Sequence, residues 1–200
     1  ERVEIPVPSL QPNEVLVEIA GCGVCHTDLG YYYDGVSTIT KPPLTLGHEI
    51  SGTVIAGDNH FLGREVIVPA VMPCNKCDIC TSGRGNRCLA QKMPGNSLGI
   101  YGGFSSHIPV PAEDLCVVGN RGDFQLAELA IIADAVTTPY QACVRAGLKK
   151  GDNVVVVGVT GGVGSYVAQM AKAFGAKTVV GIARDPEKLE RALEYGADFV

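Results

Sequence analysis

The sequence lacks the features that would place it in a membrane or on a nucleic acid. No apolar run approaches the ~20 residues that a bilayer-spanning helix needs, and the start of the chain has no apolar secretory segment. Positive charge is also scarce, because 16 Lys and Arg stand against 21 Asp and Glu. Phosphate binding requires a basic face. We therefore expect a cytoplasmic protein with no membrane and no nucleic-acid partner.

Cysteine, by contrast, is plentiful, and four of the eight residues form one tight cluster. Cys74, Cys77, Cys80 and Cys88 follow the pattern C-x2-C-x2-C-x7-C. Four thiolates complete a tetrahedral shell, so this spacing predicts a structural zinc site. An iron–sulfur cluster is the alternative, although the fourth cysteine of the ferredoxin pattern lies nearer and precedes a proline. Two disulfides are a further alternative, but metal spacing favours reduced thiols in the cytoplasm.

A second candidate metal site joins two separate stretches, residues 21–28 and 47–49. Cys25 supplies a thiolate and His48 an imidazole, 23 residues apart. A catalytic zinc takes three protein ligands and leaves one position open. Two ligands alone are a weak signal, because a buried cysteine is usually a small core residue. We interpret the three remaining cysteines as core or loop residues; they are Cys22, Cys116 and Cys143.

The first part of the chain, residues 1–125, has the pattern of a β domain. Short segments of alternating or β-branched residues are separated by Gly and Pro turns, which is typical of a barrel or sandwich. The expected strands are residues 3–5, 14–19, 50–56 and 65–69. We expect residues 31–35 to form a loop.

The second part, residues 126–200, has the pattern of an α/β fold. A continuous apolar run at residues 153–157 is typical of a buried parallel strand. The expected helices are residues 126–132, 140–146, 165–174 and 187–195, and the further strands are residues 178–182 and 198–200. This order predicts a doubly wound parallel sheet. Since half of such a sheet is not in the sequence, we expect a domain truncated at the C-terminus.

A glycine-rich turn connects the first parallel strand to the next helix. Its functional candidates are Gly158, Gly161, Gly162, Val163 and Gly164. Glycines let the backbone approach a pyrophosphate, whose charge meets the helix N-terminus. The spacing G-x-x-G-x-x-G is one residue longer than the usual dinucleotide fingerprint. A glycine turn without a ligand is the alternative.

The end of the second parallel strand bears on the choice of nucleotide. An acidic residue there would bind the ribose of NAD, whereas an arginine accepts the 2′-phosphate of NADP. Here Ala183 occupies the acidic position and Arg184 follows. The local chemistry therefore favours NADP or no preference, unless Arg184 is only a solvated surface residue.

Together these segments resemble the zinc-dependent medium-chain alcohol dehydrogenases. The resemblance includes Gly-Cys-Gly-Val-Cys-His-Thr-Asp at residues 21–28, Gly-His-Glu at 47–49, the four-cysteine lobe, Tyr-Gly-Gly-Phe at 101–104 and the glycine turn. It implies a GroES-like β domain followed by a Rossmann domain. It also implies two zinc ions per subunit, a nicotinamide cofactor and a homodimer or homotetramer.

The resemblance assigns the ligands of the catalytic zinc. Cys25 and His48 match the first two, and the third precedes a T-x-Y motif by four residues. That motif begins here at Thr138, which the resemblance places at the cofactor, so Asp134 is the implied third ligand. Glu49 matches a carboxylate that binds the zinc in some members.

The resemblance also assigns the neighbours of the zinc. Asp28 matches the carboxylate that orients the ligand histidine. Thr27 matches the hydroxyl that takes the proton of the substrate alcohol, and His26 matches a residue at the cofactor pyrophosphate. Many members have a further histidine where this sequence has Gly30, so the exit route of the proton is open; His26, Tyr31 or water are the alternatives.

Within the family, residues 30–36, 84–97 and 133–140 are most similar to a subgroup that degrades aromatic compounds anaerobically. That subgroup oxidises a cyclic hydroxy acid held as a CoA thioester and uses NAD, and we follow it in expecting NAD, with NADP not excluded. One alternative is a zinc dehydrogenase of another secondary alcohol or polyol. The other is a non-enzymatic nucleotide-binding zinc protein.

Overall fold

A computed structural model describes residues 3–200 and divides the chain into two compact units, Glu1–Asp134 and Ala135–Val200. The first two residues of the expected β domain lie outside the described residues. The expected domain boundary at residues 125 and 126 falls inside the first unit. The reason is that residues 126–133 pack on the strands of that unit.

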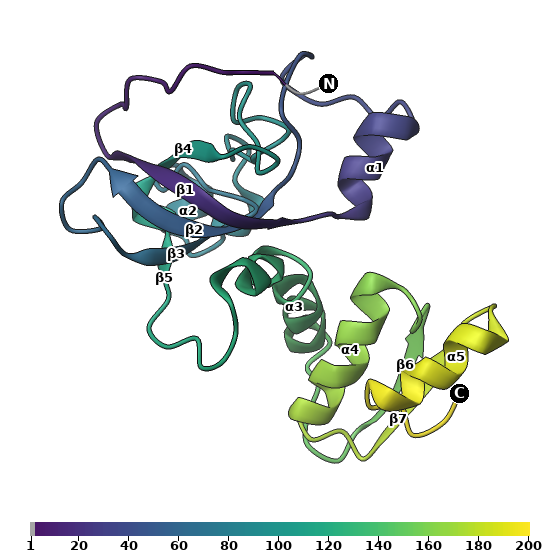
Figure 1. Ribbon diagram of the computed structural model, residues 1–200. Helices are drawn as coiled ribbons and strands as arrows, with labels where there is room; N and C mark the ends of the chain where they lie inside the picture. Colours follow the sequence, from purple (N-terminus) through teal and green to yellow (C-terminus); the bar gives the residue numbers. More distant parts are fainter. Residues whose placement is uncertain (1–2) are drawn as a thin grey trace. The chain divides into compact units, whose positions relative to one another are not determined.

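The first unit is built on a five-stranded antiparallel sheet with the order β4-β1-β2-β3-β5 (Figure 1). Its strands are β1 (Glu14–Gly23), β2 (Glu49–Ala56), β3 (Glu65–Val68), β4 (His107–Pro111) and β5 (Cys116–Val117). Its helices are α1 (His26–Tyr33), α2 (Asp78–Thr81) and the 3-10 helices η1 (Gly85–Arg87), η2 (Ala112–Asp114) and η3 (Leu126–Ala133).

The core of this unit lies on one face of the sheet, where alternate β-branched residues meet. Fully buried members include Val15, Val17, Ile50, Val66 and Ile108. Cys22 packs against the same cluster, which agrees with its interpretation as a core residue. Burial raises the pKa of the Cys22 thiol to about 12, so this thiol stays protonated.

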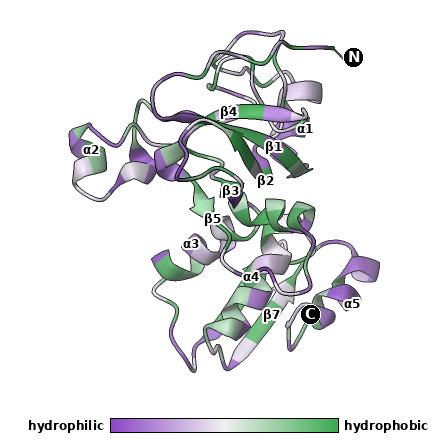
Figure 2. Ribbon diagram, turned by 60° about the vertical axis from the view of Figure 1, so that its left-hand side comes forward, coloured by the Kyte–Doolittle hydropathy of each residue, from purple (hydrophilic) through white to green (hydrophobic). Residues whose placement is uncertain are grey.

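The second unit contains a parallel strand pair with its crossover helix. Its elements are α3 (Thr137–Arg145), β6 (Asn153–Val157), α4 (Gly162–Ala173), β7 (Thr178–Ile182) and α5 (Pro186–Glu194). Strands β6 and β7 pair in register from Asn153 with Thr178 to Val157 with Ile182. Helix α5 is largely hydrophilic (Figure 2). It buries Ala192 in the core of the second unit, which also contains Val156 and Val179.

Several sequence expectations are wrong in detail. Residues 3–5 form no strand, and β1 continues through Gly23 because it pairs with β2 as far as Glu49. Residues 31–33 are helical rather than a loop, since Asp28 accepts a hydrogen bond from the Cys25 backbone and starts α1. The helix expected at residues 126–132 is present, and it is a 3-10 helix that extends through Ala133.

Two expectations for the second unit also need correction. The strand expected at residues 198–200 is a single parallel bridge between Val180 and Phe199. Strand β6 is not buried on both faces: Val156 is buried, whereas Val155 and Val157 are 60% and 79% exposed. The physical reason is that the residues packed against β6, among residues 3–200, lie on the face of Val156 and leave the opposite face open. In the same part of the chain, no helix is long and apolar enough to span a bilayer.

Candidate metal centre and nucleotide site

Four side chains of the first unit converge on one point. Cys25 lies at the start of α1, His48 and Glu49 lie at the start of β2, and Asp134 follows η3. One ligand atom of each lies within 4.8 Å of the others. The segments come together because β1 pairs with β2 while η3 packs on both strands. The structure thus groups the four residues that the family resemblance assigned to the catalytic zinc.

The separations within this group suit a tetrahedral cation. Asp134 Oδ2 lies 3.7 Å from Cys25 Sγ and 3.4 Å from His48 Nε2. Ligands bonded at ~2.0–2.3 Å to one tetrahedral zinc are roughly 3.3–3.8 Å apart. A thiolate, an imidazole and a carboxylate are also the donor types that zinc takes. The three residues therefore fit the ligand set of a catalytic zinc, with Glu49 as a fourth donor in the group.

The imidazole of His48 supports the same interpretation. It is 1% exposed, and its Nδ1 and Nε2 lie 3.3 Å from Asp28 and 3.4 Å from Asp134. Within the described residues, neither nitrogen makes a hydrogen bond of good geometry despite these short distances. Burial lowers the pKa of His48, but the carboxylates of Asp134 and Asp28 raise it to about 10. Two carboxylates at these distances from the ring attract a cation, and zinc on Nε2 would take the place of a proton there.

Asp28 connects the two ligand-bearing segments. This buried carboxylate accepts hydrogen bonds from the backbone N–H of Gly47 at 2.9 Å and of Cys25 at 3.1 Å, and it faces His48 Nδ1. Burial raises its pKa, but the adjacent His48 imidazole and the bonds from the Cys25 and Gly47 N–H groups outweigh this and lower the pKa below its ordinary value. An ionised partner of this kind fixes the orientation of a ligand imidazole.

The residues expected to handle the substrate proton lie beside this group. Thr27 and His26 are exposed in the first turn of α1, and Thr27 Oγ1 lies 3.6 Å from Cys25 Sγ. Sequence reasoning did not single out Asn96, whose Nδ2 donates to the Tyr31 hydroxyl at 2.6 Å. The two residues are 65 positions apart, so no local pattern could have indicated this pair.

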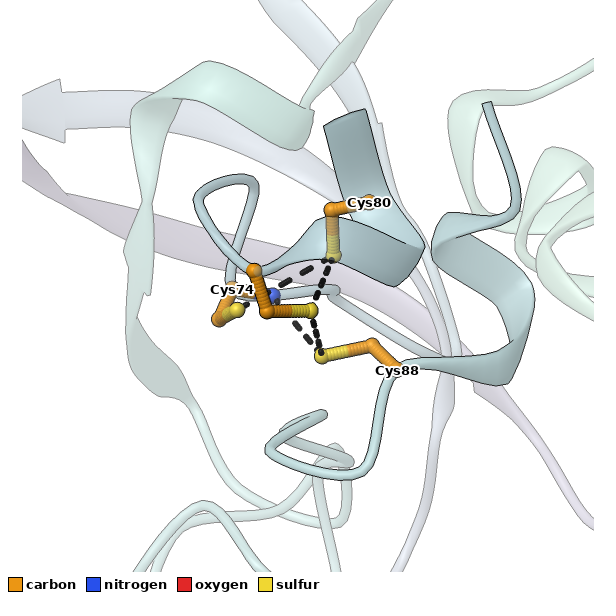
Figure 3. A group of neighbouring side chains, drawn as sticks. Cys74, Cys80 and Cys88 are labelled. Atoms are coloured by element: carbon orange, nitrogen blue, oxygen red, sulfur yellow. Dashed lines mark hydrogen bonds between the residues drawn. The ribbon is translucent and has the colours of Figure 1, made fainter. Parts of the chain in front are cut away.

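The four-cysteine cluster forms in its own lobe of the first unit. Cys77 Sγ lies 3.4 Å from Cys80 Sγ and 4.0 Å from Cys88 Sγ, and Cys74 Sγ lies 3.9 Å from Cys80 Sγ. Figure 3 shows the sulfur atoms of Cys74, Cys80 and Cys88 directed at one another. All eight cysteines lie in the described residues, and none is in a disulfide. Thiolates bonded at ~2.3 Å to one tetrahedral zinc are roughly 3.8 Å apart, so the lobe fits a closed structural site.

Backbone amides donate to two of the sulfur atoms of this cluster. The N–H groups of Cys74 and Ala90 donate to Cys88 Sγ at 3.4 Å and 3.3 Å. The N–H groups of Lys76 and Cys77 lower the pKa of Cys74 to about 6. Thiolates held by amides are prepared to bind metal, because a thiol must lose its proton to become a ligand.

The glycine turn of the second unit has the form that a pyrophosphate requires. Gly158 has φ +77°, which favours glycine, and its N–H donates to Ile182 at 2.7 Å. A Cβ on Gly164 would clash with the Gly158 carbonyl, so this glycine permits close packing of strand and helix. A Cβ on Gly162 would meet nothing within 4 Å, so the backbone at the start of α4 is open to a ligand.

The remaining nucleotide candidates lie at the ends of other elements. Arg184 is exposed after β7, and Ala183 packs against the core of the second unit. Asp185, the nearest carboxylate, caps α5 by accepting from the N–H groups of Glu187 and Lys188. Thr138 is exposed in the first turn of α3.

Comparison with known proteins identifies the class. Residues 11–120 match the model of the alcohol dehydrogenase GroES-like domain, and residues 162–200 match that of zinc-binding dehydrogenases. The chain therefore belongs to the zinc-dependent medium-chain alcohol dehydrogenase family, with a GroES-like β domain followed by a Rossmann-type unit.

Individual relatives agree with this assignment. An alcohol dehydrogenase of Geobacillus stearothermophilus is 36% identical over 98% of the chain and 58% of its own length. The D-arabinose 1-dehydrogenase (NADP(+)) of Saccharolobus solfataricus is 37% identical over 100% of the chain and 58% of its own length. The structure of alcohol dehydrogenase TADH from Thermus sp. ATN1 matches with a TM-score of 0.89 at 28% identity, covering 99% of this chain and 59% of that one. The chain thus spans about 58% of the length of these curated relatives.

Proposed function

We propose that the chain is the metal-binding and nucleotide-binding part of an enzyme that transfers a hydride between a secondary alcohol and a nicotinamide nucleotide. The observation that carries this proposal is the convergence of Cys25, His48 and Asp134 beside the exposed Thr27 hydroxyl. Three protein ligands leave a tetrahedral zinc one position for substrate. Membership of the dehydrogenase family supports the same reaction.

Each residue of the group has a role in the proposed reaction. Cys25, His48 and Asp134 would hold a zinc ion, which when bound lowers the pKa of a substrate hydroxyl as a Lewis acid. Thr27 accepts the proton of that hydroxyl, and Tyr31, His26 or water passes it on in place of the absent histidine at Gly30. Asp28 keeps the His48 ring in orientation through Nδ1. Glu49 is close enough to join the ligand set.

The glycine turn of the second unit is the proposed site of the cofactor pyrophosphate, with NAD as the nucleotide. Backbone N–H groups at the start of α4 would bind the phosphates. NADP is the second candidate, because Asp185 is engaged in capping α5 while Arg184 is exposed at the end of β7. Comparing kcat/KM for NAD and NADP before and after Arg184→Ala decides between them. A selective loss with NADP would assign the arginine to a 2′-phosphate.

For the substrate, we propose 6-hydroxycyclohex-1-ene-1-carbonyl-CoA, oxidised to its 6-oxo product. The resemblance of residues 30–36, 84–97 and 133–140 to the dehydrogenase of that compound supports this choice. Another secondary alcohol or a polyol is the alternative, since the relatives include proteins named sorbitol dehydrogenase and D-arabinose 1-dehydrogenase. Initial rates with the CoA thioester, its free acid, sorbitol, D-arabinose and simple secondary alcohols would separate the two.

Metal content tests the proposed enzyme against a non-enzymatic zinc protein. An enzyme of this kind holds two zinc ions per chain, one in the lobe and one at the mixed-ligand site, whereas a merely structural role needs one. We further propose that it is a cytoplasmic homodimer or homotetramer, which sedimentation of the purified protein would show. One zinc per chain with no alcohol-dependent reduction of either nucleotide would refute the proposed function.

A further inference from the structure

The strand pair that leads to the metal group places a glycine opposite a serine on the face away from the core. In the register of β1 and β2, Gly21 lies opposite Ser51, while Cys22 lies opposite Ile50. Residues that face each other across antiparallel strands share one side of the sheet. Ile50 belongs to the buried core, and Cys22 packs against it. Gly21 and Ser51 therefore share the other side, on which η3 packs.

Gly21 leaves the space that η3 occupies. A Cβ built on Gly21 would lie 2.6 Å from the carbonyl oxygen of Ala127 and 2.7 Å from its Cα. These are backbone atoms, which cannot move aside as the end of a long side chain can. Any other residue at this position would therefore displace the first turn of η3 from the sheet.

Ser51 anchors the same turn by a hydrogen bond. Its side chain is 0% exposed, and its Oγ donates to the carbonyl oxygen of Leu126 at 2.6 Å. Without this bond, the partly buried Leu126 carbonyl would lose its side-chain partner. Gly21 and Ser51 together form a seat for Leu126 and Ala127, one permitting the close approach and the other fixing it.

The seat matters because η3 ends at Asp134. The helix runs from Leu126 to Ala133, and its C-cap is Asp134, whose Oδ2 lies 3.4 Å from His48 Nε2. Because η3 runs without a break from the turn held by Gly21 and Ser51 to Asp134, a shift of its first turn should change the position of this carboxylate. Ligand atoms tolerate only small displacements, since metal–ligand distances must hold to about 0.2 Å.

We propose that Gly21 and Ser51 are positioning residues for the carboxylate ligand Asp134. They touch neither metal nor substrate and act through η3. This inference rests on the proposed function, because it takes Asp134 as a ligand of the mixed-ligand metal site. The glycine of the Gly-Cys-Gly stretch is thus required by a segment that lies more than a hundred residues further along the chain.

The test is metal affinity at each of the two sites in the intact protein. Competition of a colorimetric chelator for Zn²⁺ gives the affinities, and Co²⁺ substitution gives an absorption spectrum that reports ligand geometry. Outer-shell changes typically cost about 10–100-fold in metal affinity. We expect about 10-fold weaker binding at the mixed-ligand site for Ser51→Ala and about 100-fold for Gly21→Ala. The four-cysteine site should keep its affinity and its thiolate–Co²⁺ bands.

Gly119→Ala is the matched control, because Gly119 belongs to the same unit and a Cβ there would meet nothing within 4 Å. A circular-dichroism spectrum and a melting temperature close to those of the wild type report that each variant is folded. Should Gly21→Ala fail to fold, Ser51→Ala decides, since it removes one atom and adds none.

Asp134→Asn separates the two ways in which the proposal can fail. If Asp134→Asn weakens the mixed-ligand site while Ser51→Ala and Gly21→Ala leave it unchanged, the seat has no positioning role, and the proposed function stands. If Asp134→Asn itself leaves metal affinity and the Co²⁺ spectrum unchanged, Asp134 is not a ligand, and the positioning role fails together with the proposed ligand set.

Discussion

The two metal clusters of the first unit differ in how the chain brings their ligands together. The four cysteines of the lobe lie within one short segment, with Cys74 and Cys88 14 positions apart. The mixed-ligand group joins Cys25 to Asp134 across 109 positions. The lobe is therefore held by local turns, α2 and η1, whereas the mixed-ligand group depends on the pairing of β1 with β2 and on the packing of η3. Four thiolates close the coordination shell of the lobe, whereas three protein ligands at the mixed-ligand site would leave one position open for chemistry.

The largest expected effect is on activity, from Cys25→Ser. Loss of this thiolate removes Lewis-acid catalysis worth several kcal/mol, so we expect kcat/KM to fall on the order of 10³-fold or more. One zinc should remain per chain, and the melting temperature should change little, because the lobe is untouched. Steady-state kinetics and metal analysis of the same preparation provide the measurement. Full activity without metal at this site would contradict the assignment.

The next effect is on stability, from Cys77→Ser in the lobe. A closed structural zinc contributes folding free energy directly. If several kcal/mol are lost, the melting temperature should fall by roughly 10 °C, at about 2–4 °C per kcal/mol for a chain of this size. Thermal unfolding followed by circular dichroism gives the value. Cys116→Ser is the control, because this exposed cysteine lies outside both clusters, and an equal fall in that variant would refute the structural role.

The difference between the clusters also explains what the sequence could predict. Spacing alone predicted the lobe, since its ligands are close in the chain. The strands at Asn153–Val157 and Thr178–Ile182 were predicted to the residue, because continuous β-branched runs between glycines have few other interpretations. Cys25 and His48 were weak candidates by themselves, and Asp134 entered only through the family resemblance.

What the sequence could not predict depends on segments that fold back over one another. The role of Gly21 requires knowledge that η3 lies on β1, which no local pattern contains. The helical state of residues 31–33 follows from the carboxylate of Asp28 at the start of α1, and a run of tyrosines obscured it. The exposure of Val155 and Val157 reflects which face of β6 the other elements cover, not the apolar character of the run.

A smaller effect, and one that depends on pH, is expected for Asp28→Asn. Removing this charge should weaken metal binding at the mixed-ligand site about 10–100-fold and leave the lobe unchanged. The folded-state pKa of Asp28 is lowered, so its ionised form stabilises the fold above the ordinary aspartate pKa, and this contribution is lost as the pH falls through the folded-state value. The melting temperatures of wild type and variant should therefore differ most near pH 7 and converge below about pH 4. A difference that is constant across this range would assign the effect to packing rather than charge.

The smallest expected effect is on stability, and it tests whether the four-cysteine lobe depends on contacts outside its own segment. Asn75 Nδ2 donates to Asp114 Oδ1 at 2.9 Å and attaches the first turn of the lobe to η2, in an exposed position. Asp114→Ala should lower the free energy of unfolding by about 0.5–1.5 kcal/mol, the usual net value of one hydrogen bond. Because the thiolates are held by their own turns, both zinc ions should remain. Glu113→Ala is the matched control, since it removes the same charge from the adjacent exposed residue. Loss of the lobe zinc in Asp114→Ala alone would show that this cluster, too, depends on contacts outside its own segment.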